Sequence, residues 1–265
     1  MPPRRVRASA IPPEPPVDHV PLLPTIVVSC FKGGVWKTSL AVAMAERLAW
    51  AGLRVVLLTC DPQEDARSRL GHRGSSEMLL NQNCGTGSLT TAGAQQAVAL
   101  DLVYRKGPER LGIGTFDIAI LDTPPMEMGG NLSGVYLVVP MDGEDAVRNA
   151  ATMLRHTPAS TDIMLVRVVD LNQAEWEEDM NAIYGVLGRE VEFLEGPLPF
   201  SPEVKAAHRR GQSVWTLERE GATRVFLSGV EELAHRTWVR YFSRRPWPAM
   251  PILSQQQQIR FSGWK

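Results

Sequence analysis

Short apolar runs alternate with longer amphipathic segments along most of this chain. The runs contain four to seven residues, many of them β-branched, which is typical of strands that are buried on both faces of a sheet. They lie at residues 25–30, 54–58, 116–121, 135–139, 163–169 and 191–194. Between them, apolar residues at helical spacing predict helices at residues 39–51, 144–156, 175–187 and 223–242. This alternation predicts a doubly wound α/β domain, with a mostly parallel sheet flanked by helices and a ligand site at the carboxyl ends of the strands.

Three parts of the chain differ in composition. Residues 1–24 are rich in proline and lack apolar periodicity, which predicts a flexible leader. Residues 25–245 contain the alternating pattern and are expected to form one domain. Residues 246–265 are predicted to be a basic and aromatic C-terminal tail, in which prolines interrupt any helix. Within the domain, residues 71–115 are too weakly patterned for us to assign elements.

The overall composition excludes several classes of protein. A hydrophobic fraction of 44% in 265 residues is incompatible with wholesale disorder. The apolar runs fall well short of the roughly 18–20 residues that span a membrane. Three cysteines are too few for a disulfide framework, so Cys30 and Cys60, which end neighbouring strands, are expected to be buried free thiols. We therefore expect a cytoplasmic protein that does not bind a membrane.

The chemically informative segment lies between the first predicted strand and the first predicted helix. Its glycine pair at 33–34 allows backbone N–H groups to turn toward a phosphate, and the start of the following helix favours negative charge. In such a loop, Lys37 would reach the β- and γ-phosphates and the Thr38 hydroxyl would ligate Mg²⁺. The match to the general pattern G-x-x-x-x-G-K-[ST] is incomplete, because Phe31 and Trp36 occupy the two glycine positions.

The segment resembles the deviant Walker A motif, K-G-G-x-G-K-T, of the ParA/MinD family of ATPases. Further segments resemble motifs of this family in the same order and spacing. They are Asp61-Pro62-Gln63 (similar to D-x-D-P-Q), residues 116–125 (the Walker B strand), residues 138–140 (the strand end that follows), and residues 199–201 with 206–214 (the loop and helix that close the nucleotide site). The resemblance covers roughly residues 25–245.

The resemblance implies a site for ATP and Mg²⁺ and suggests roles for residues of this sequence. Lys32 would cross a dimer interface and neutralise the partner's phosphates, as an arginine finger does. Asp61 would position or activate the attacking water, and Asp122 would hold Mg²⁺ together with Thr38. The implied catalytic residues are Lys32, Lys37 and Asp61. The residues implied to contact ATP are Gly33, Gly34, Val35, Trp36, Lys37, Thr38, Ser39 and Pro199.

Two departures from the family's pattern affect these expectations. Thr59 stands where the first aspartate of D-x-D-P-Q contributes to the metal shell, so metal affinity is expected to be lower. Trp36 replaces the glycine before Lys37, where a left-handed backbone costs a non-glycine residue roughly 1–2 kcal/mol. Either the indole points away from the phosphates and the site works, or the pocket binds nucleotide poorly. The retained motif residues favour a working site.

The net charge of −1 conceals an uneven distribution. Residues 1–232 carry 22 basic and 29 acidic side chains, whereas residues 233–265 carry six basic and no acidic ones. Arginines spaced by four share one face of the last predicted helix. The set that we interpret as a surface is Arg236, Arg240, Arg244 and Arg245. This surface is either a solvated helix face or a non-specific DNA-binding surface, as in the family. An anionic membrane is a third option, which the prolines of the tail disfavour.

Together with the resemblance, these features predict a single-domain ParA-type DNA-partition ATPase. The expected cycle is MgATP-dependent homodimerisation, non-specific DNA binding, and slow hydrolysis stimulated by a centromere-binding or cargo adaptor protein. The protein would be associated with the nucleoid and would segregate plasmid or chromosomal DNA. Two alternatives stay open: a ParA-fold pseudo-ATPase that acts as an adaptor module, and a MinD-like ATPase that positions other proteins.

Overall fold

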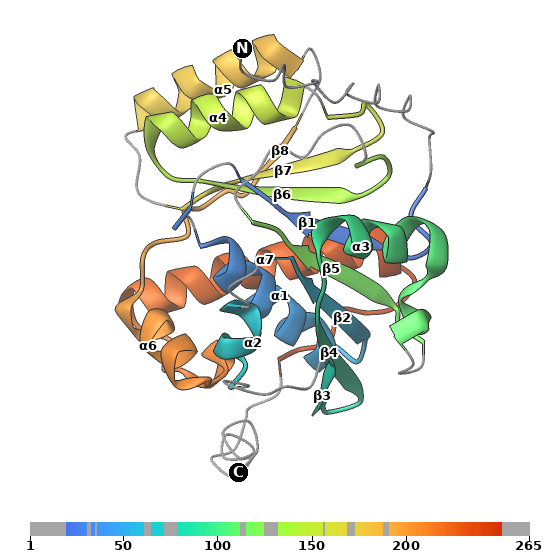
Figure 1. Cartoon of the computed structure of the whole chain (residues 1–265). Helices are drawn as coiled ribbons and strands as arrows, with labels where there is room; N and C mark the ends of the chain where they lie inside the picture. The colour runs from blue at the N-terminus through green and yellow to red at the C-terminus, as the bar shows by residue number, and fades with distance from the viewer. Residues whose placement is uncertain are drawn as a thin grey trace, which may run out of the picture.

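The computed structural model describes residues 20–30, 33–34, 36–60, 65–71, 79–111, 115–124, 132–155, 157–168, 173–187 and 191–250. Within these ranges, eight strands form one sheet in the order β3-β4-β2-β5-β1-β6-β7-β8 (Figure 1). The strands are β1 (Thr25–Val28), β2 (Arg54–Thr59), β3 (Leu79–Cys84), β4 (Gly87–Gly93), β5 (Ile118–Asp122), β6 (Tyr136–Met141), β7 (Asp162–Arg167) and β8 (Glu192–Phe193). Every neighbouring pair is parallel except β3 and β4. The predicted doubly wound, mostly parallel sheet is confirmed.

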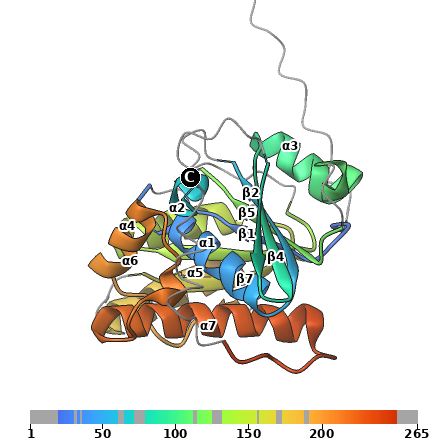
Figure 2. The ribbon, with the colours of Figure 1, turned by 90° about the horizontal axis from the view of Figure 1, so that it is seen from below.

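Helices cover both faces of this sheet (Figure 1). On one face lie α1 (Lys37–Trp50), α2 (Asp65–Arg69), α6 (Pro202–Arg210) and α7 (Gly221–Phe242), and on the other lie α3 (Gln96–Asp101), α4 (Gly143–Arg155) and α5 (Gln173–Leu187). Because side chains alternate along a strand, Ile26 and Val28 pack in the core with α1 and α7, whereas Val27 packs in the core with α4 and α5. Figure 2 shows α7 running across the first face.

The observed elements agree with the predicted ones to within a few residues. Helix α1 begins at Lys37, two residues before the predicted start, so the lysine and threonine of the phosphate-loop pattern belong to its first turn. Strand β1 ends at Val28 rather than at Cys30. Cys30, Cys60 and Cys84 are buried thiols that form no disulfide, as predicted for the first two. In the part of the chain that the structure describes, no helix is both long enough and apolar enough to cross a membrane.

The segment left unassigned at 71–115 contains an antiparallel hairpin and a run of short helical turns. Strand β3 pairs with β4 across a turn at Gly85, which adopts a φ of 60°. Helix α3 then continues into the π-helix η1 (Leu102–Lys106) and the 3₁₀ turn η2 (Pro108–Leu111). The polar sequence of β3 and the short, irregular turns explain why periodicity did not reveal them. The backbone N–H of Leu22 donates to the Val103 carbonyl at 2.9 Å, so η1 contacts the last part of the predicted leader.

A C-terminal segment, residues 243–250, packs back onto α1 and α7. The Trp238 indole N–H donates to the Arg245 carbonyl at 2.8 Å, and the Trp238 and Trp247 rings meet edge to face at 5.4 Å. Trp247 and Met250 pack against the core that contains α1. The packed unit therefore includes residues up to Met250. Residues 251–265 of the predicted tail lie outside the described residues.

Arg47 joins this segment to the interior. Its side chain is fully buried on α1, and its Nε and one Nη donate to the Glu231 carboxylate of α7 at 2.5 and 2.8 Å. The same Nη donates to the Pro248 carbonyl at 2.6 Å, and the guanidinium lies 4.0 Å from the centre of the Trp247 ring. The Trp247 indole N–H also donates to Glu231 at 3.0 Å. One buried cation thus holds together α1, α7 and the C-terminal segment.

Glu46, beside Arg47 on α1, makes the stability of the fold depend on pH. Burial raises the pKa of its carboxyl to about 8, and a hydrogen bond with the Ser213 side chain lowers it by less. A raised pKa means that the folded state holds the proton more tightly than the unfolded state does. The stability that this proton contributes is therefore complete below pH 4.5 and is lost as the pH rises through about 8.

We expect the substitution Glu46→Gln to remove this dependence. Between pH 5 and pH 8 the unfolding free energy of the wild type should fall relative to the variant by an amount on the order of 3 kcal/mol. Urea unfolding at the two pH values measures the difference, with Glu218→Gln, a change at an exposed glutamate, as the control. A gap between wild type and Glu46→Gln that stays constant with pH would contradict the assignment.

Candidate functional site

The predicted phosphate loop connects the end of β1 with the start of α1. Gly34 adopts a φ of 80°, a left-handed conformation that favours glycine. Lys37, Thr38 and Ser39, in the first turn of α1, are 7%, 9% and 3% exposed. The described part of the loop therefore combines a glycine turn, a helix N-terminus and a lysine, which together suit a phosphate. Lys32 and Val35, also predicted to contribute, lie outside the described residues.

Trp36 occupies the position where the general pattern has glycine. Its φ of 63° and ψ of 9° are left-handed, and it is the one non-glycine residue with positive φ in the described part of the chain. Such a conformation costs roughly 1–2 kcal/mol for a residue with a Cβ. The indole packs between Phe200, at a centroid distance of 5.2 Å, and Phe226 of α7, at 5.4 Å. The backbone thus keeps the turn of the glycine motif while the side chain is held by aromatic rings of other segments.

The carboxyl ends of three central strands converge beside this loop. In the sheet register, Asp122 at the end of β5 lies between Val28 of β1 and Thr59 of β2. Asp122 is fully buried, and its carbonyl accepts a hydrogen bond from the Cys60 N–H at 2.8 Å. Burial, and next the charge of Asp122, raise the pKa of the Cys60 thiol to about 12. The parallel register therefore brings a carboxylate to the loop that contains Lys37 and Thr38. Asp61, which follows β2, lies outside the described residues.

The residues present at these strand ends suit a hydrated Mg²⁺ ion. A threonine hydroxyl and an aspartate carboxylate are the hard oxygen ligands that Mg²⁺ prefers, with phosphate oxygens and water completing its shell. The Ser29 and Thr59 hydroxyls are also buried here, and neither finds a hydrogen-bond partner within the described residues. Buried polar atoms of this kind indicate water or an ion as their partner. No group of three or more His, Cys, Asp or Glu side chains that could hold a metal ion occurs in the described ranges.

Helix α2 supplies a cation that the sequence motifs did not indicate. The Arg69 guanidinium donates to the Ser39 hydroxyl in the first turn of α1. Helix α2 is positioned by α6, because Gly71 and Gly211 approach so closely that a Cβ on Gly211 would lie 2.3 Å from the Gly71 Cα. His208 of α6 is buried nearby, and burial, followed by the charge of Arg69, lowers its pKa to about 3. The His208 imidazole is therefore neutral near pH 7 and places no second positive charge beside Arg69.

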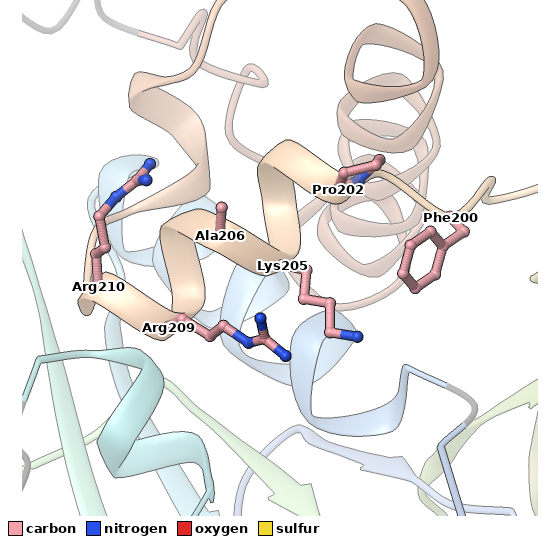
Figure 3. Close-up of a pocket in the computed structure, with 6 residues that line it drawn as sticks. All are labelled: Phe200, Pro202, Lys205, Ala206, Arg209 and Arg210. Atoms are coloured by element: carbon pink, nitrogen blue, oxygen red, sulfur yellow. The ribbon is translucent and has the colours of Figure 1, made fainter.

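A pocket of about 400 Å³ lies along α6. Its lining residues are Phe200, Pro202, Lys205, Ala206, Arg209 and Arg210 (Figure 3). Figure 3 shows Lys205 and Arg209 extending from α6 toward α1, whereas Arg210 lies at the far end of the helix. The Lys205 ammonium is 5.4 Å from the centre of the Phe200 ring. Pro199, a predicted ATP contact, immediately precedes this half-exposed aromatic residue. Three cations and one aromatic face suit an anionic, planar ligand.

Comparison with known proteins identifies the family. The sequence matches the CobQ/CobB/MinD/ParA nucleotide binding domain over residues 26–214. This protein belongs to the ParA/MinD family of P-loop ATPases. The match begins in β1 and includes the phosphate loop, β5 with Asp122, and all of α6. The resemblance inferred from the motifs is therefore confirmed. No curated protein matches the chain in sequence.

Solved structures share the fold of this ParA/MinD-family chain at low sequence identity. The MinD cell division protein of Aquifex aeolicus has a TM-score of 0.55 and 18% identity, with 80% of this chain and 97% of that one aligned. The pNOB8 ParA has a TM-score of 0.56 and 15% identity, covering 84% and 100%. MinD of Pyrococcus horikoshii, solved with Mg-ADP, has a TM-score of 0.55 and 15% identity, covering 80% and 96%. Identities this low establish the fold alone.

The C-terminal arginines of this ParA/MinD-family chain do not form one continuous basic face. Arg236 lies 2.6 Å from Glu232 and 3.7 Å from Glu192. Arg240 pairs with Glu192 at 2.5 Å and with Asp162, and it stacks over the Tyr136 ring at 4.6 Å. Most of these carboxylates come from β7 and β8, which the charge count of the last segment did not include. Two of the four arginines are thus compensated within the fold, and the exposed pair is Arg244 and Arg245.

Proposed function

We propose that the chain is a ParA-type DNA-partition ATPase that binds MgATP between the phosphate loop and α6. The observation that carries this proposal is the convergence of Lys37 and Thr38, at the start of α1, with Asp122, at the end of β5, in a member of a nucleotide-binding family. The Mg-ADP complex of P. horikoshii MinD, a protein of the same fold, supports this choice of ligand.

Each residue of the proposed site has a separate role. Lys37 and the N–H groups at the start of α1 bind the phosphates, because their positive charge and the helix dipole act on the same group. Thr38 and Asp122 would hold Mg²⁺, which when bound neutralises phosphate charge during hydrolysis. The pocket along α6, with Pro199 at its edge, would take the base end of the nucleotide. Of the catalytic residues implied by the motifs, Lys32 is proposed to act across a nucleotide-dependent dimer, and Asp61 to position the attacking water.

The packing of Trp36 favours an active site over the alternative of a pseudo-ATPase adaptor. That alternative depended on an indole occupying the space beside the phosphates. Phe200 and Phe226 instead hold the indole on the side of α6 and α7. Trp36 would therefore contribute backbone groups to the proposed ATP site, while its indole packs toward α6 and α7.

The proposed partners are a second copy of the chain, non-specific DNA, and a centromere-binding or cargo adaptor protein that stimulates hydrolysis. Arg244 and Arg245 are the DNA-binding residues that we retain, because they are exposed where α7 ends. The compensated pair, Arg236 and Arg240, is assigned to the fold. The partition role implies a cytoplasmic protein that gathers on the nucleoid.

A DNA-retention experiment tests the proposed function. We expect the wild type to bind random-sequence duplex DNA only with MgATP, and Arg244→Glu with Arg245→Glu to weaken this binding roughly 100-fold while nucleotide affinity is unchanged. The matched control is Arg236→Gln with Arg240→Gln, which removes two compensated arginines and should leave DNA affinity near that of the wild type. Gel shifts at two salt concentrations measure both. Wild type that binds MgATP but no DNA would support the MinD-like alternative instead.

A further inference from the structure

The phosphate loop and the α6 pocket are joined by one side chain. The Trp36 carbonyl accepts the first backbone hydrogen bond of α1, from the Leu40 N–H at 2.8 Å, so the residue is part of the helix start itself. Its side chain makes no hydrogen bond to the helix end. The contribution of the Trp36 side chain to holding this left-handed residue in place is therefore the packing of its indole.

The two aromatic partners of Trp36 differ in how firmly they are fixed. Phe226 is fully buried in the middle of the core, on α7. Phe200 is half-exposed, precedes α6 and lines the pocket. The indole meets the Phe200 ring edge to face, with an interplanar angle of 81°, and the Phe226 ring at 45°. Edge-to-face and tilted contacts at these distances are favourable. Trp36 thus connects a rigid anchor in the core with a residue at the rim of the pocket.

We propose that Trp36 is a positioning residue of the nucleotide site, which holds the phosphate loop in its binding conformation by packing between Phe200 and Phe226. This inference rests on the proposed function, because the ligand positioned is the nucleoside triphosphate. A glycine at position 36 would relieve the backbone strain, but it would also let the loop adopt many conformations when no ligand is bound. A ligand that must first select one loop conformation binds more weakly.

A positioning role for Trp36 predicts the opposite of what the glycine motif alone suggests. Restoring the glycine of the family pattern, Trp36→Gly, is expected to weaken MgATP binding by about tenfold or more rather than to strengthen it. Trp36→Phe keeps an aromatic ring in place and should stay within about threefold of the wild type. The matched control is Trp50→Phe, at the other end of α1, which should leave affinity unchanged.

Calorimetric titration of the full chain with MgATP measures these changes, and Phe200→Ala provides a second test. Phe200 is half-exposed, so its removal is compatible with folding; it should weaken binding about threefold. In the double variant Trp36→Gly with Phe200→Ala, the second substitution should weaken binding by less than it does in the wild type, since the contact between the two rings is already lost and only the contact of Phe200 with the ligand remains. Urea midpoints measured in parallel separate this effect from a loss of stability, which would not produce such coupling in the dissociation constant.

The possible results distinguish this inference from the proposed function. Wild type that fails to bind MgATP at millimolar concentration would overturn both. Wild type that binds, together with a Trp36→Gly variant that binds equally well or better, would overturn the positioning role alone. If Trp36→Gly does not fold, Trp36→Ala takes its place in the same cycle with Phe200→Ala: an equal effect of Phe200→Ala in both backgrounds would refute the role, and a smaller effect in the Trp36→Ala background would support it.

Discussion

Replacing Lys37 by alanine is expected to abolish measurable MgATP binding, with a dissociation constant raised roughly 100-fold or more. Lys37 is 7% exposed in the first turn of α1, where a charged hydrogen bond to phosphate is sheltered from water. Its loss would leave the bound phosphates without their main cation, and the helix dipole alone cannot replace a full charge. Titration calorimetry of the full chain measures the effect.

Two further variants make the Lys37 experiment specific. Lys106→Ala removes a lysine whose side chain is 61% exposed and paired with Asp101, and it should leave MgATP affinity unchanged. Asp122→Asn should weaken binding of MgATP more than binding of ATP with excess chelator, because its proposed ligand is the metal. A Lys37→Ala variant that binds MgATP within threefold of the wild type would refute the phosphate-binding role of this loop.

The second large effect concerns stability. Arg47→Ala is expected to lower the unfolding free energy by about 3 kcal/mol, because a buried cation is lost and the Glu231 carboxylate keeps no equivalent partner. This loss of stability is at the lower end of the range for breaking a buried ion pair, since the Glu231 side chain is 32% exposed and can recover some hydration. The same change removes the bond to Pro248, so amide hydrogen exchange in residues 243–250 should accelerate along with the global loss.

Matched changes separate the charge of Arg47 from its volume. Arg47→Met keeps much of the buried volume and should destabilise less than Arg47→Ala. Arg54→Ala removes an arginine whose pair with Asp117 lies at the surface, and it should change the urea midpoint little. If Arg47→Ala and Arg54→Ala shift the urea midpoint equally, the contacts of Arg47 with Glu231 and Pro248 do not hold the C-terminal segment in place.

The sequence predicted best what depends on local pattern. Strands β1, β2, β5 and β6 are continuous apolar runs because both of their faces are covered, and the alternation of such runs with helices predicted a mostly parallel sheet. The strand order did not follow from this pattern, because β5 lies between β1 and β2, which were expected to be neighbours. The resemblance implied that Asp122 shares a metal ion with Thr38, and the parallel register places Asp122 beside Val28, at the end of the strand that leads into the phosphate loop. In this part of the molecule, local propensity and tertiary structure agree.

The features that the sequence did not reveal depend on contacts distant in sequence. The arginines at 236 and 240 were included in a candidate basic surface, but two of their carboxylate partners, Glu192 and Asp162, come from strands more than 40 positions earlier. Arg69 reaches Ser39 only because α2 docks against α6, which no motif encodes. The direction of the Trp36 indole likewise depends on Phe200 and Phe226, each more than 160 positions away. Spacing within one segment contains no information about such pairs.

The two borders of the sheet limit how copies of this protein can associate. One border is β3, whose sequence LLNQNC places polar residues along the strand and which runs antiparallel to its neighbour. The other is β8, only two residues long, whose Glu192 is engaged by Arg240. Short or polar borders are poor templates for adding a strand from another molecule. A continuous sheet shared between two copies is therefore disfavoured, so the proposed nucleotide-dependent dimer is expected to form without strand pairing.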